Sequence, residues 1–405
     1  MNKLERQIME LTDRDFDVLV SLRREFHRHP EIGREEHWTA ARIEEELDKL
    51  GLPHHRCAKT GVVAFADGTA ESPVPLTEDG RPRCMALRAD IDALPLTERR
   101  ESPYKSEIPG QMHACGHDVH LTSLLGAARV LRACRDLYAG RILLVFQPSE
   151  ENGFGGRRMV EEGAVAGATR CFGFHIAPEL KCGTLALMEG ANNASVDWFR
   201  MTIKGEGTHA AYPHQGADAL YIAAQVVVAA QALVTRMNDP AQPLLLGFGR
   251  LEAGTTYNVV ADRAVLEGTI RALDPEVRKN IIRRLEQLLQ DTAALYGGTA
   301  SAEWDVNGEM LINTAEAVRE ARKTAVSLFG EDRLVIRKPA LIGDDMSDYI
   351  NAVSGCYAFI GTQDPGRPDT AHPLHHACLD VDEDVFKVSV PMTAAYALEY
   401  MRGEI

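Results

Sequence analysis

Short apolar runs alternate with longer amphipathic stretches along most of this chain, and this alternation constrains the fold more than any other feature of the sequence. Four runs have the composition of buried strands, and they lie at residues 84–87, 141–147, 171–174 and 356–361. Helical periodicity covers residues 13–50 with a break at His29-Pro30, because the residue before proline is disfavoured in a helix. The alternation predicts an α/β fold, with a mostly parallel sheet flanked by helices.

The pattern changes between residues 191 and 306, which we interpret as an inserted domain. Three segments there alternate as half-buried strands do, at residues 198–204, 244–252 and 264–272. Two long helical patterns, 217–237 and 275–296, lie among them, so the insert is predicted to be α+β with an antiparallel sheet. Helical periodicity resumes at 314–329, and we therefore expect one domain built from residues 1–190 and 307–405, interrupted by a second domain at 191–306.

Composition excludes several classes of protein. The 405 residues are 45% hydrophobic and 25% charged, as in an ordinary globular protein, and 44 basic against 59 acidic side chains give a net charge of −15. This charge repels phosphate backbones and anionic membranes, so we expect neither a nucleic-acid partner nor a membrane partner. The charged amino terminus lacks the apolar core of a signal peptide, and eight scattered cysteines suggest reduced thiols. The predicted location is the cytoplasm.

Acids and histidines follow the four predicted strands. Asp90 and Asp92 come after the first, Glu150 and Glu151 after the second, His175 after the third, and the segment 372–376 after the last. Ligands and chemistry gather beyond the carboxyl ends of parallel strands, because the loops converge there. The sequence therefore predicts that these side chains meet at one site.

The densest cluster of reactive side chains is Met-His-Ala-Cys-Gly-His-Asp-Val-His at residues 112–120, just before a predicted amphipathic helix at 121–134. A single histidine near a helix start is more often a capping or core residue. Cys115 and His117 are two apart with only Gly116 between them, so both can turn toward one ion. This cluster favours metal binding over a structural role.

The Glu150-Glu151 pair supplies the two roles that metal-assisted hydrolysis needs. Adjacent acids in a loop are usually solvated surface charge, but these stand at a strand end. Successive loop residues can point apart, so one carboxylate can ligate metal while its neighbour acts as general base on a water.

His175 and His375 extend the candidate ligand set, although alone one could be a core histidine and the other a surface histidine. With Cys115, His117 and Glu151 they make five ligands, enough for two ions that share a bridge. Paired ions about 3.5–4 Å apart can hold a hydroxide between them and polarise the carbonyl that it attacks.

Six separated motifs resemble one known family, the dinuclear metal-dependent amidohydrolases that include hippurate hydrolase, N-acyl amino acid deacylases and indole-acetyl amino acid hydrolases. The motifs, in unchanged order over nearly the whole chain, are MHACGHDVH, FQPSEENGFGG, GFHIAP, GEGTHAAYPHQGAD, YNVVAD and PLHHACLDVDE. The resemblance implies a catalytic domain with an inserted lid domain that also mediates homodimerisation.

The resemblance also implies a role for each matching residue. Cys115, His117, Glu151, His175 and His375 match the family's metal ligands, and Glu150 matches its general base. His209 matches a histidine that helps to polarise the scissile carbonyl, often in the partner subunit's active site. Asn258 and Arg271 match lid positions that bind the carboxylate end of the substrate.

Some assignments stay open at this point. Metal-bound imidazoles usually donate their second N–H to an acceptor, for which Asp92 is preferred and Asp118 competes. His376 competes with His375, because relatives usually have a small polar residue and a proline after the late histidine. Relatives also tend to have a Glu-Asp pair and an aromatic residue where this chain has Gly343-Asp344-Asp345-Met346, a loop expected to shape the pocket. Zinc or manganese is the preferred metal, with cobalt and nickel as alternatives.

The predicted function is hydrolysis of N-acetyl, N-benzoyl or arylacetyl amino acids to a carboxylic acid and a free amino acid. The same machinery would serve a dipeptidase or carboxypeptidase. Two other hypotheses are a binding protein that has kept the fold without catalysis, and a hydrolase that uses Cys115 as nucleophile.

Overall fold

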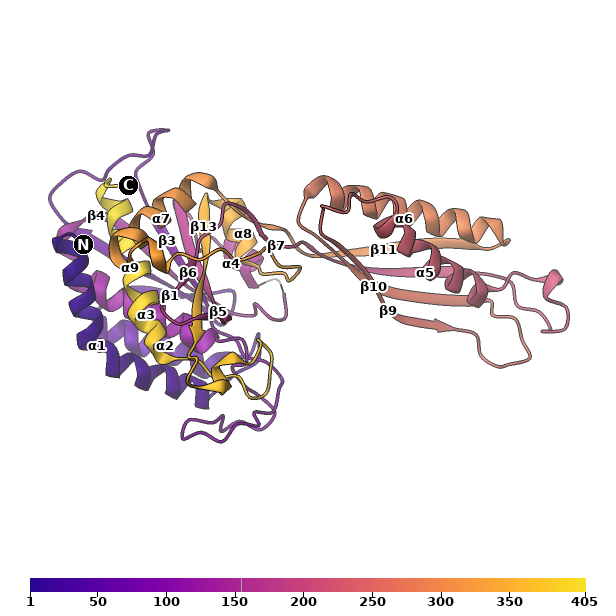
Figure 1. Cartoon of the computed structure of the whole chain (residues 1–405), viewed down its shortest axis with the longest axis horizontal. Helices are drawn as coiled ribbons and strands as arrows, with labels where there is room; N and C mark the ends of the chain where they lie inside the picture. The colour runs from indigo at the N-terminus through magenta and orange to yellow at the C-terminus, as the bar shows by residue number, and fades with distance from the viewer. Residues whose placement is uncertain (154) are drawn as a thin grey trace. The chain divides into compact units, whose positions relative to one another are not determined.

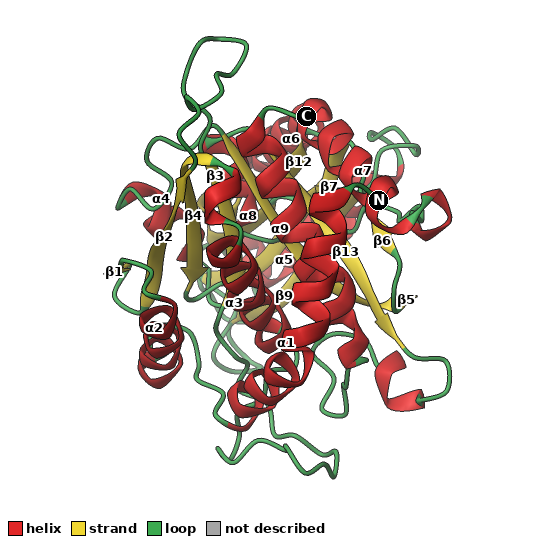
Figure 2. Ribbon diagram, turned by 90° about the vertical axis from the view of Figure 1, so that its left-hand side faces the viewer, coloured by secondary structure: helices red, strands yellow, loops and turns green. Residues whose placement is uncertain are grey.

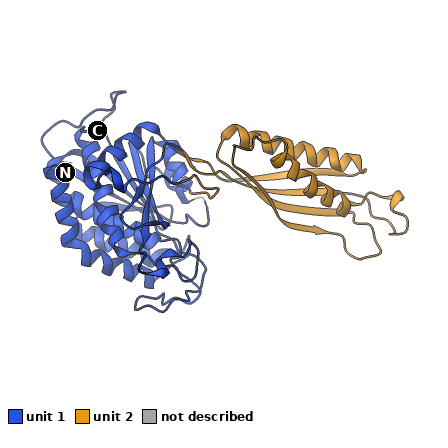
Figure 3. Ribbon diagram, viewed as in Figure 1, with its two compact units in different colours: residues 1–190, 313–337, 345–405 blue, residues 191–312, 338–344 orange. Residues whose placement is uncertain are grey.

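The computed structural model describes residues 1–153 and 155–405, apart from the side chains of 306 and 307, and it divides into two compact units (Figure 3). Unit 1 comprises Met1–Gly190, Asn313–Arg337 and Asp345–Ile405. Unit 2 comprises Ala191–Ile312 and Lys338–Asp344. Unit 2 thus runs past the expected boundary at 306 and includes a second, short segment of the chain.

Unit 1 is built on a seven-stranded sheet with the order β1-β2-β4-β3-β5-β13-β6. Its strands are β1 (His54–Cys57), β2 (Gly61–Thr69), β3 (Met85–Asp90), β4 (Ala139–Gln147), β5 (Arg170–Lys181), β6 (Leu185–Ala186) and β13 (Gly355–Gln363). The four central strands β4, β3, β5 and β13 run parallel, and the outer pairings are antiparallel. The predicted α/β class with a mostly parallel sheet is confirmed.

Helices cover both faces of this sheet (Figures 1 and 2). They are α1 (Lys3–Arg28), α2 (His37–Leu50), α3 (His117–Ala133), α4 (Gly155–Glu161), α7 (Ala315–Phe329), α8 (Met346–Ala352) and α9 (Phe386–Arg402). Helices α1, α3 and α9 contact one another, and α4 contacts α8. Chain ends far apart in sequence therefore share one helical layer, since α9 lies beside α1.

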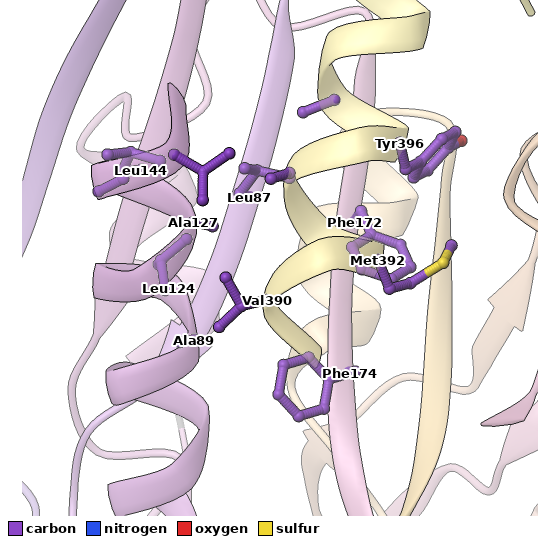
Figure 4. Packing of buried hydrophobic residues seen from close by; sticks show 14 of the residues in the cluster. Leu87, Ala89, Leu124, Ala127, Leu144, Phe172, Phe174, Val390, Met392 and Tyr396 are labelled. Carbon is purple, nitrogen blue, oxygen red and sulfur yellow. The ribbon is translucent and has the colours of Figure 1, made fainter. Parts of the chain in front are cut away.

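The core of unit 1 lies between this helical layer and the central strands (Figure 4). In Figure 4 α3 and α9 direct their apolar side chains toward the sheet. The labelled residues come from α3, α9 and the strands β3, β4 and β5: Leu87, Ala89, Leu124, Ala127, Leu144, Phe172, Phe174, Val390, Met392 and Tyr396. Because β3 is buried along its whole length, it can place the residues after Asp90 accurately.

Unit 2 contains a four-stranded antiparallel sheet with the order β11-β8-β10-β9. Its strands are β8 (Val196–Lys204), β9 (Leu244–Ala253), β10 (Arg263–Ala272) and β11 (Thr299–Gly308), and its helices are α5 (Ala219–Thr235) and α6 (Pro275–Leu295). Asp218 and Asp274 cap the two helices by accepting hydrogen bonds from backbone N–H groups of the first turn. A separate two-stranded pair joins β7 (Gly190–Asn193) to β12 (Leu311–Asn313).

Two local expectations are wrong. The helix expected to begin at 121 begins at His117, and β5 continues through His175 to Lys181 instead of ending before it. Within the described residues, no helix combines the length and apolar character needed to cross a bilayer.

Candidate active site

The candidate site lies where the parallel strands β3 and β4 of unit 1 end. Asp90 is the last residue of β3, and Asp92 follows two residues later. Glu150 and Glu151 follow the end of β4, and Ser149 before them has a φ of 58°, a left-handed conformation that few non-glycine residues adopt. His175 projects from β5, the neighbour of β3.

Gly116 allows Cys115 and His117 to approach the same point. It caps α3 with a φ of 84°, which non-glycine residues rarely adopt. A Cβ atom at this position would lie 2.2 Å from Cδ1 of Ile176, the residue that follows His175 in β5. Glycine therefore suits the turn, and any other residue here would also require the side chain of Ile176 to move.

His117 is fully buried and is oriented by Asp92. Its Nδ1 lies 2.9 Å from the backbone oxygen of Asp92 and 3.2 Å from Oδ1 of the same residue. A carbonyl can only accept, so Nδ1 carries a proton, and Nε2 is left as the ring's candidate ligand atom, buried without a hydrogen-bond partner among the described residues. Burial alone would lower the pKa of His117, but the carboxylates of Asp90, Asp92 and Glu151 raise it to about 10. The position therefore favours a positive charge.

Burial and a backbone hydrogen bond hold His175 in the tautomer that a metal ligand needs. Its Nδ1 donates to the backbone oxygen of Ile176 at 2.7 Å, and its Nε2 lies 3.4 Å from Sγ of Cys115. Burial lowers the pKa of His175 well below its usual value, so the ring is neutral. Burial and the nearby Glu151 and Glu150 raise the pKa of Cys115, whereas nucleophilic cysteines have a lowered pKa.

Glu151 and His375 complete the cluster. Nε2 of His375 lies 3.1 Å from Oε1 of Glu151, an oxygen that is buried without a hydrogen bond in the described part of the chain. The backbone N–H of His375 donates to the oxygen of Ala114 at 2.7 Å, which ties this late loop to the residue before Cys115. His375 has a φ of 63° and a side chain that is 52% exposed, so the cluster opens to solvent on this side.

The ligand atoms form two overlapping sets of three that share Cys115. The first set is Cys115, His117 and His175, and the second is Cys115, Glu151 and His375. Within each set the atoms lie within 4.8 Å of one another, and Glu150 forms a further set with His117 and Glu151. Thiolate, imidazole and carboxylate are suitable donors for a divalent transition metal, and neither Nε2 of His117 nor Oε1 of Glu151 makes a hydrogen bond within the described residues.

Two neighbouring histidines, His120 and His376, have partners of their own outside this cluster. His120 donates from Nδ1 to Asp90 at 2.6 Å and accepts at Nε2 from the backbone N–H of Ile176, so both nitrogens are used. The ring of His376 stacks on that of His372, with centroids 4.1 Å apart. Of the two late histidines, His375 is the one that the structure brings to Glu151.

Of the two aspartates expected to compete as partner of a metal-bound imidazole, only Asp92 contacts the ring of His117. Asp92 contacts His117, and its second oxygen accepts from the backbone N–H of Glu151 at 3.1 Å. Asp118 instead pairs with Arg23 at 2.7 Å, away from the imidazole next to it in sequence.

A buried network beneath the site is not evident from sequence patterns. The guanidinium of Arg88 in β3 donates to Asp90 at 2.6 Å, to Gln147 at 2.8 Å and to Asp345 at 2.7 Å. Asp345 also accepts from the backbone N–H of Gly156 at 2.7 Å. The sequence assigns this loop only to pocket shape, yet Asp345 joins the ends of β3 and β4. The one sequence signal of this network is Arg88, a charged residue within the buried strand β3.

The other predicted residues, His209, Asn258 and Arg271, belong to unit 2. His209 pairs with Val259 in an antiparallel bridge, and Ala210 donates to the backbone oxygen of Asn258 at 3.1 Å, so the first two lie on adjoining segments. Arg271 is half-buried, donates to Thr269 at 3.2 Å and forms no ion pair within the described residues. Their catalytic and binding roles stay predictions.

Fold and cluster together define a class. An α/β unit with a thiol, imidazoles and carboxylates at the ends of its parallel strands is typical of metal-dependent hydrolases. The sequence model of peptidase family M20/M25/M40 matches residues 86–399, and the chain belongs to this family. It is a hydrolase of amide bonds.

Three curated relatives match most of the chain. N-acetyl-L-cysteine deacetylase of Bacillus subtilis is 37% identical over 90% of this chain and 84% of its own length. IAA-amino acid hydrolase ILR1-like 5 of Arabidopsis thaliana is 32% identical over 99% of this chain and 91% of its own length. Thermostable carboxypeptidase 2 of Saccharolobus solfataricus is also 32% identical, over 99% of this chain and 98% of its own length.

A solved structure shows a closely similar fold. It is the YXEP protein of Bacillus subtilis, described as a dinuclear metal binding peptidase of the M20 family. It is 29% identical, with a TM-score of 0.83 over 96% of this chain and 99% of that one. The predicted resemblance is confirmed.

Proposed function

We propose that this enzyme hydrolyses N-acyl amino acids to a carboxylic acid and a free amino acid, with two divalent metal ions held by Cys115, His117, Glu151, His175 and His375. The observation that carries the proposal is the pair of overlapping ligand sets that share Cys115, with the carboxylate of Glu150 beside them. The names of the deacetylase and the IAA-amino acid hydrolase describe the same kind of substrate. Thiolate and imidazole donors favour zinc, with manganese next and cobalt or nickel as alternatives.

Each side chain has a distinct role in this proposal. Bound ions would supply a Lewis acid for the carbonyl oxygen and a water of lowered pKa. Glu150 takes the proton from the attacking water and returns it to the departing amine nitrogen. His209 donates to the developing oxyanion, and Arg271 and Asn258 bind the substrate carboxylate. The guanidinium of Arg271 is half-buried and has five donors suited to a carboxylate, which supports the last role.

The second candidate is a dipeptidase or carboxypeptidase that uses the same residues. The 32% identity to a carboxypeptidase over 99% of this chain favours it. A panel of N-acetyl, N-benzoyl and arylacetyl amino acids and dipeptides distinguishes the two, and we expect the highest kcat/KM on an N-acyl amino acid.

The metal and the base are tested together. Removal of metal with a chelator is expected to abolish hydrolysis, and addition of zinc or manganese to restore it. Glu150→Gln should lower kcat by about 10²–10⁴-fold at unchanged ion content, because it removes the proton acceptor and no ligand. Glu101→Gln, at a carboxylate that is 90% exposed, is the matched control. Activity that survives metal removal and is lost on thiol alkylation would instead identify Cys115 as a nucleophile.

We also infer a cytoplasmic homodimer. All eight cysteines are free thiols, which supports a reducing compartment. Unit 2 exposes apolar side chains on its sheet and on α5, including Trp198 at 47% and Val228 at 71%, which supports burial against a second copy.

A further inference from the structure

A second group of soft ligands lies in the loop that carries His375. The side chains of His372, His376 and Cys378 bring one ligand atom each to within 4.8 Å of one another. The two imidazole rings are stacked, with centroids 4.1 Å apart and planes at 16°. All three residues are partly exposed, so an ion could reach them from solvent. His375, between them in sequence, turns its ring to Glu151 instead.

The donor chemistry of this group suits an ion of the zinc class. Imidazole and thiolate are both zinc ligands, and three protein ligands leave the fourth tetrahedral position to water. Cys378 is a free thiol.

Two features of the loop oppose binding. Arg99 places a positive charge near His376, and the backbone N–H of Cys378 donates to Nδ1 of His376 at 3.2 Å. That hydrogen bond is long, so an ion can replace it at small cost. We therefore expect this site to bind zinc more weakly than the buried cluster.

We propose that His372, His376 and Cys378 form a third metal-binding site, selective for zinc-class ions and separate from the pair at Cys115. An ion there would join both ends of the segment 372–378, whose backbone is also fixed by Arg99 N–H donating to Ala377 oxygen at 2.8 Å. Because His375 is within that segment, occupation would restrict the motion of a residue that contacts Glu151. The proposal does not depend on the function proposed above.

Zinc stoichiometry of the intact enzyme tests the site. The purified protein is dialysed against a series of free zinc concentrations, and bound zinc is measured by elemental analysis. The wild type is expected to bind one more zinc per chain than Cys378→Ser or His372→Gln. His37→Gln, at a histidine that is 60% exposed elsewhere on the surface, should match the wild type. Equal zinc content in the wild type and both variants would overturn the proposal, whatever the buried cluster holds.

A second measurement needs no variant. Modification of each cysteine by a thiol reagent is followed by mass spectrometry, with the buried cluster already loaded and with added zinc varied. Zinc should slow modification of Cys378 at least tenfold and leave the partly exposed Cys84 unchanged. Modification of Cys378 at the same rate with and without zinc would contradict the site even where a substitution had disturbed folding.

Discussion

At the residue scale, Asp92 determines how two of the candidate ligands are presented. One carboxylate oxygen accepts from the ring of His117, and the other accepts from the backbone N–H of Glu151. A single side chain thus fixes an imidazole tautomer and the loop that carries a carboxylate. Outer contacts of this kind orient a metal ligand and fix its tautomer, so their loss weakens metal binding.

Asp92→Asn is therefore expected to weaken metal binding by about 10–100-fold, because an amide cannot accept at both positions. Competition with a chromophoric chelator measures the affinity. Asp67→Asn removes a carboxylate that is 47% exposed and serves as the control. Unchanged affinity in Asp92→Asn would mean that the backbone oxygen of Asp92 alone orients His117.

At the scale of elements, the start of α3 depends on glycine for two separate reasons. Gly116 needs a left-handed φ of 84°, and Ile176 leaves no space for a Cβ. Gly51 at the end of α2 has a similar φ of 64° but has open space around it. Alanine substitutions at the two positions therefore distinguish the cost of backbone strain alone from the cost of strain together with side-chain crowding.

Alanine at Gly51 should lower the free energy of unfolding by about 1 kcal/mol, the cost of a left-handed alanine. Alanine at Gly116 adds a clash in the core and should lower the free energy of unfolding by about 2–4 kcal/mol in total. Denaturant unfolding of both variants gives the comparison. Equal losses would show that Ile176 moves aside without cost.

A buried ionic network links α1 to the segments that carry Arg100 and Asp380. Asp380 is 1% exposed and lies 2.8 Å from Arg100, 3.1 Å from the hydroxyl of Tyr104 and 3.6 Å from Arg23. Burial would raise the pKa of Asp380, but Arg23 and Arg100 lower it below the ordinary value of 3.8. Because the pKa of Asp380 is lowered in the folded state, its interactions with Arg23 and Arg100 stabilise the fold above pH 3.8. This stabilisation is lost as the pH falls below that value.

Asp380→Asn should lower the free energy of unfolding at pH 7 by about 3–5 kcal/mol, because it leaves buried guanidinium groups without their carboxylate. The variant should also lose less stability than the wild type on acidification below pH 3.8. Urea unfolding at a series of pH values measures both effects. Asp384→Asn, at an aspartate that is 56% exposed, should leave both nearly unchanged.

At the scale of the whole molecule, we expect sedimentation to show a homodimer at micromolar concentration. Val228→Glu places a charge on the apolar exposed side of α5 and should shift the equilibrium toward monomer. Ile336→Glu alters a residue of unit 1 that is 96% exposed and should not. A wild-type monomer would contradict the dimer and the expectation, from the resemblance, that His209 reaches a partner's site.

The sequence indicated the α/β fold and the residues of the cluster because both depend on local patterns: apolar runs, and acids or histidines next to them. It placed the start of α3 too late because His117 and His120 are polar yet buried, and their partners Asp92 and Asp90 belong to another segment. It could not assign Asp345 to the base of the site, since Arg88 lies 257 residues away. Contacts of that range leave no local periodicity.

The split of unit 1 has a consequence for synthesis on the ribosome. Strand β13 pairs with β5 inside the sheet, and α9 packs on α1 and α3, yet both belong to the last of the three segments of unit 1 to be translated. All of unit 2 has been translated by Asp344. The nascent chain can therefore complete unit 2 while the apolar face of α3 still awaits its cover, and during that interval it would be a natural client for chaperones.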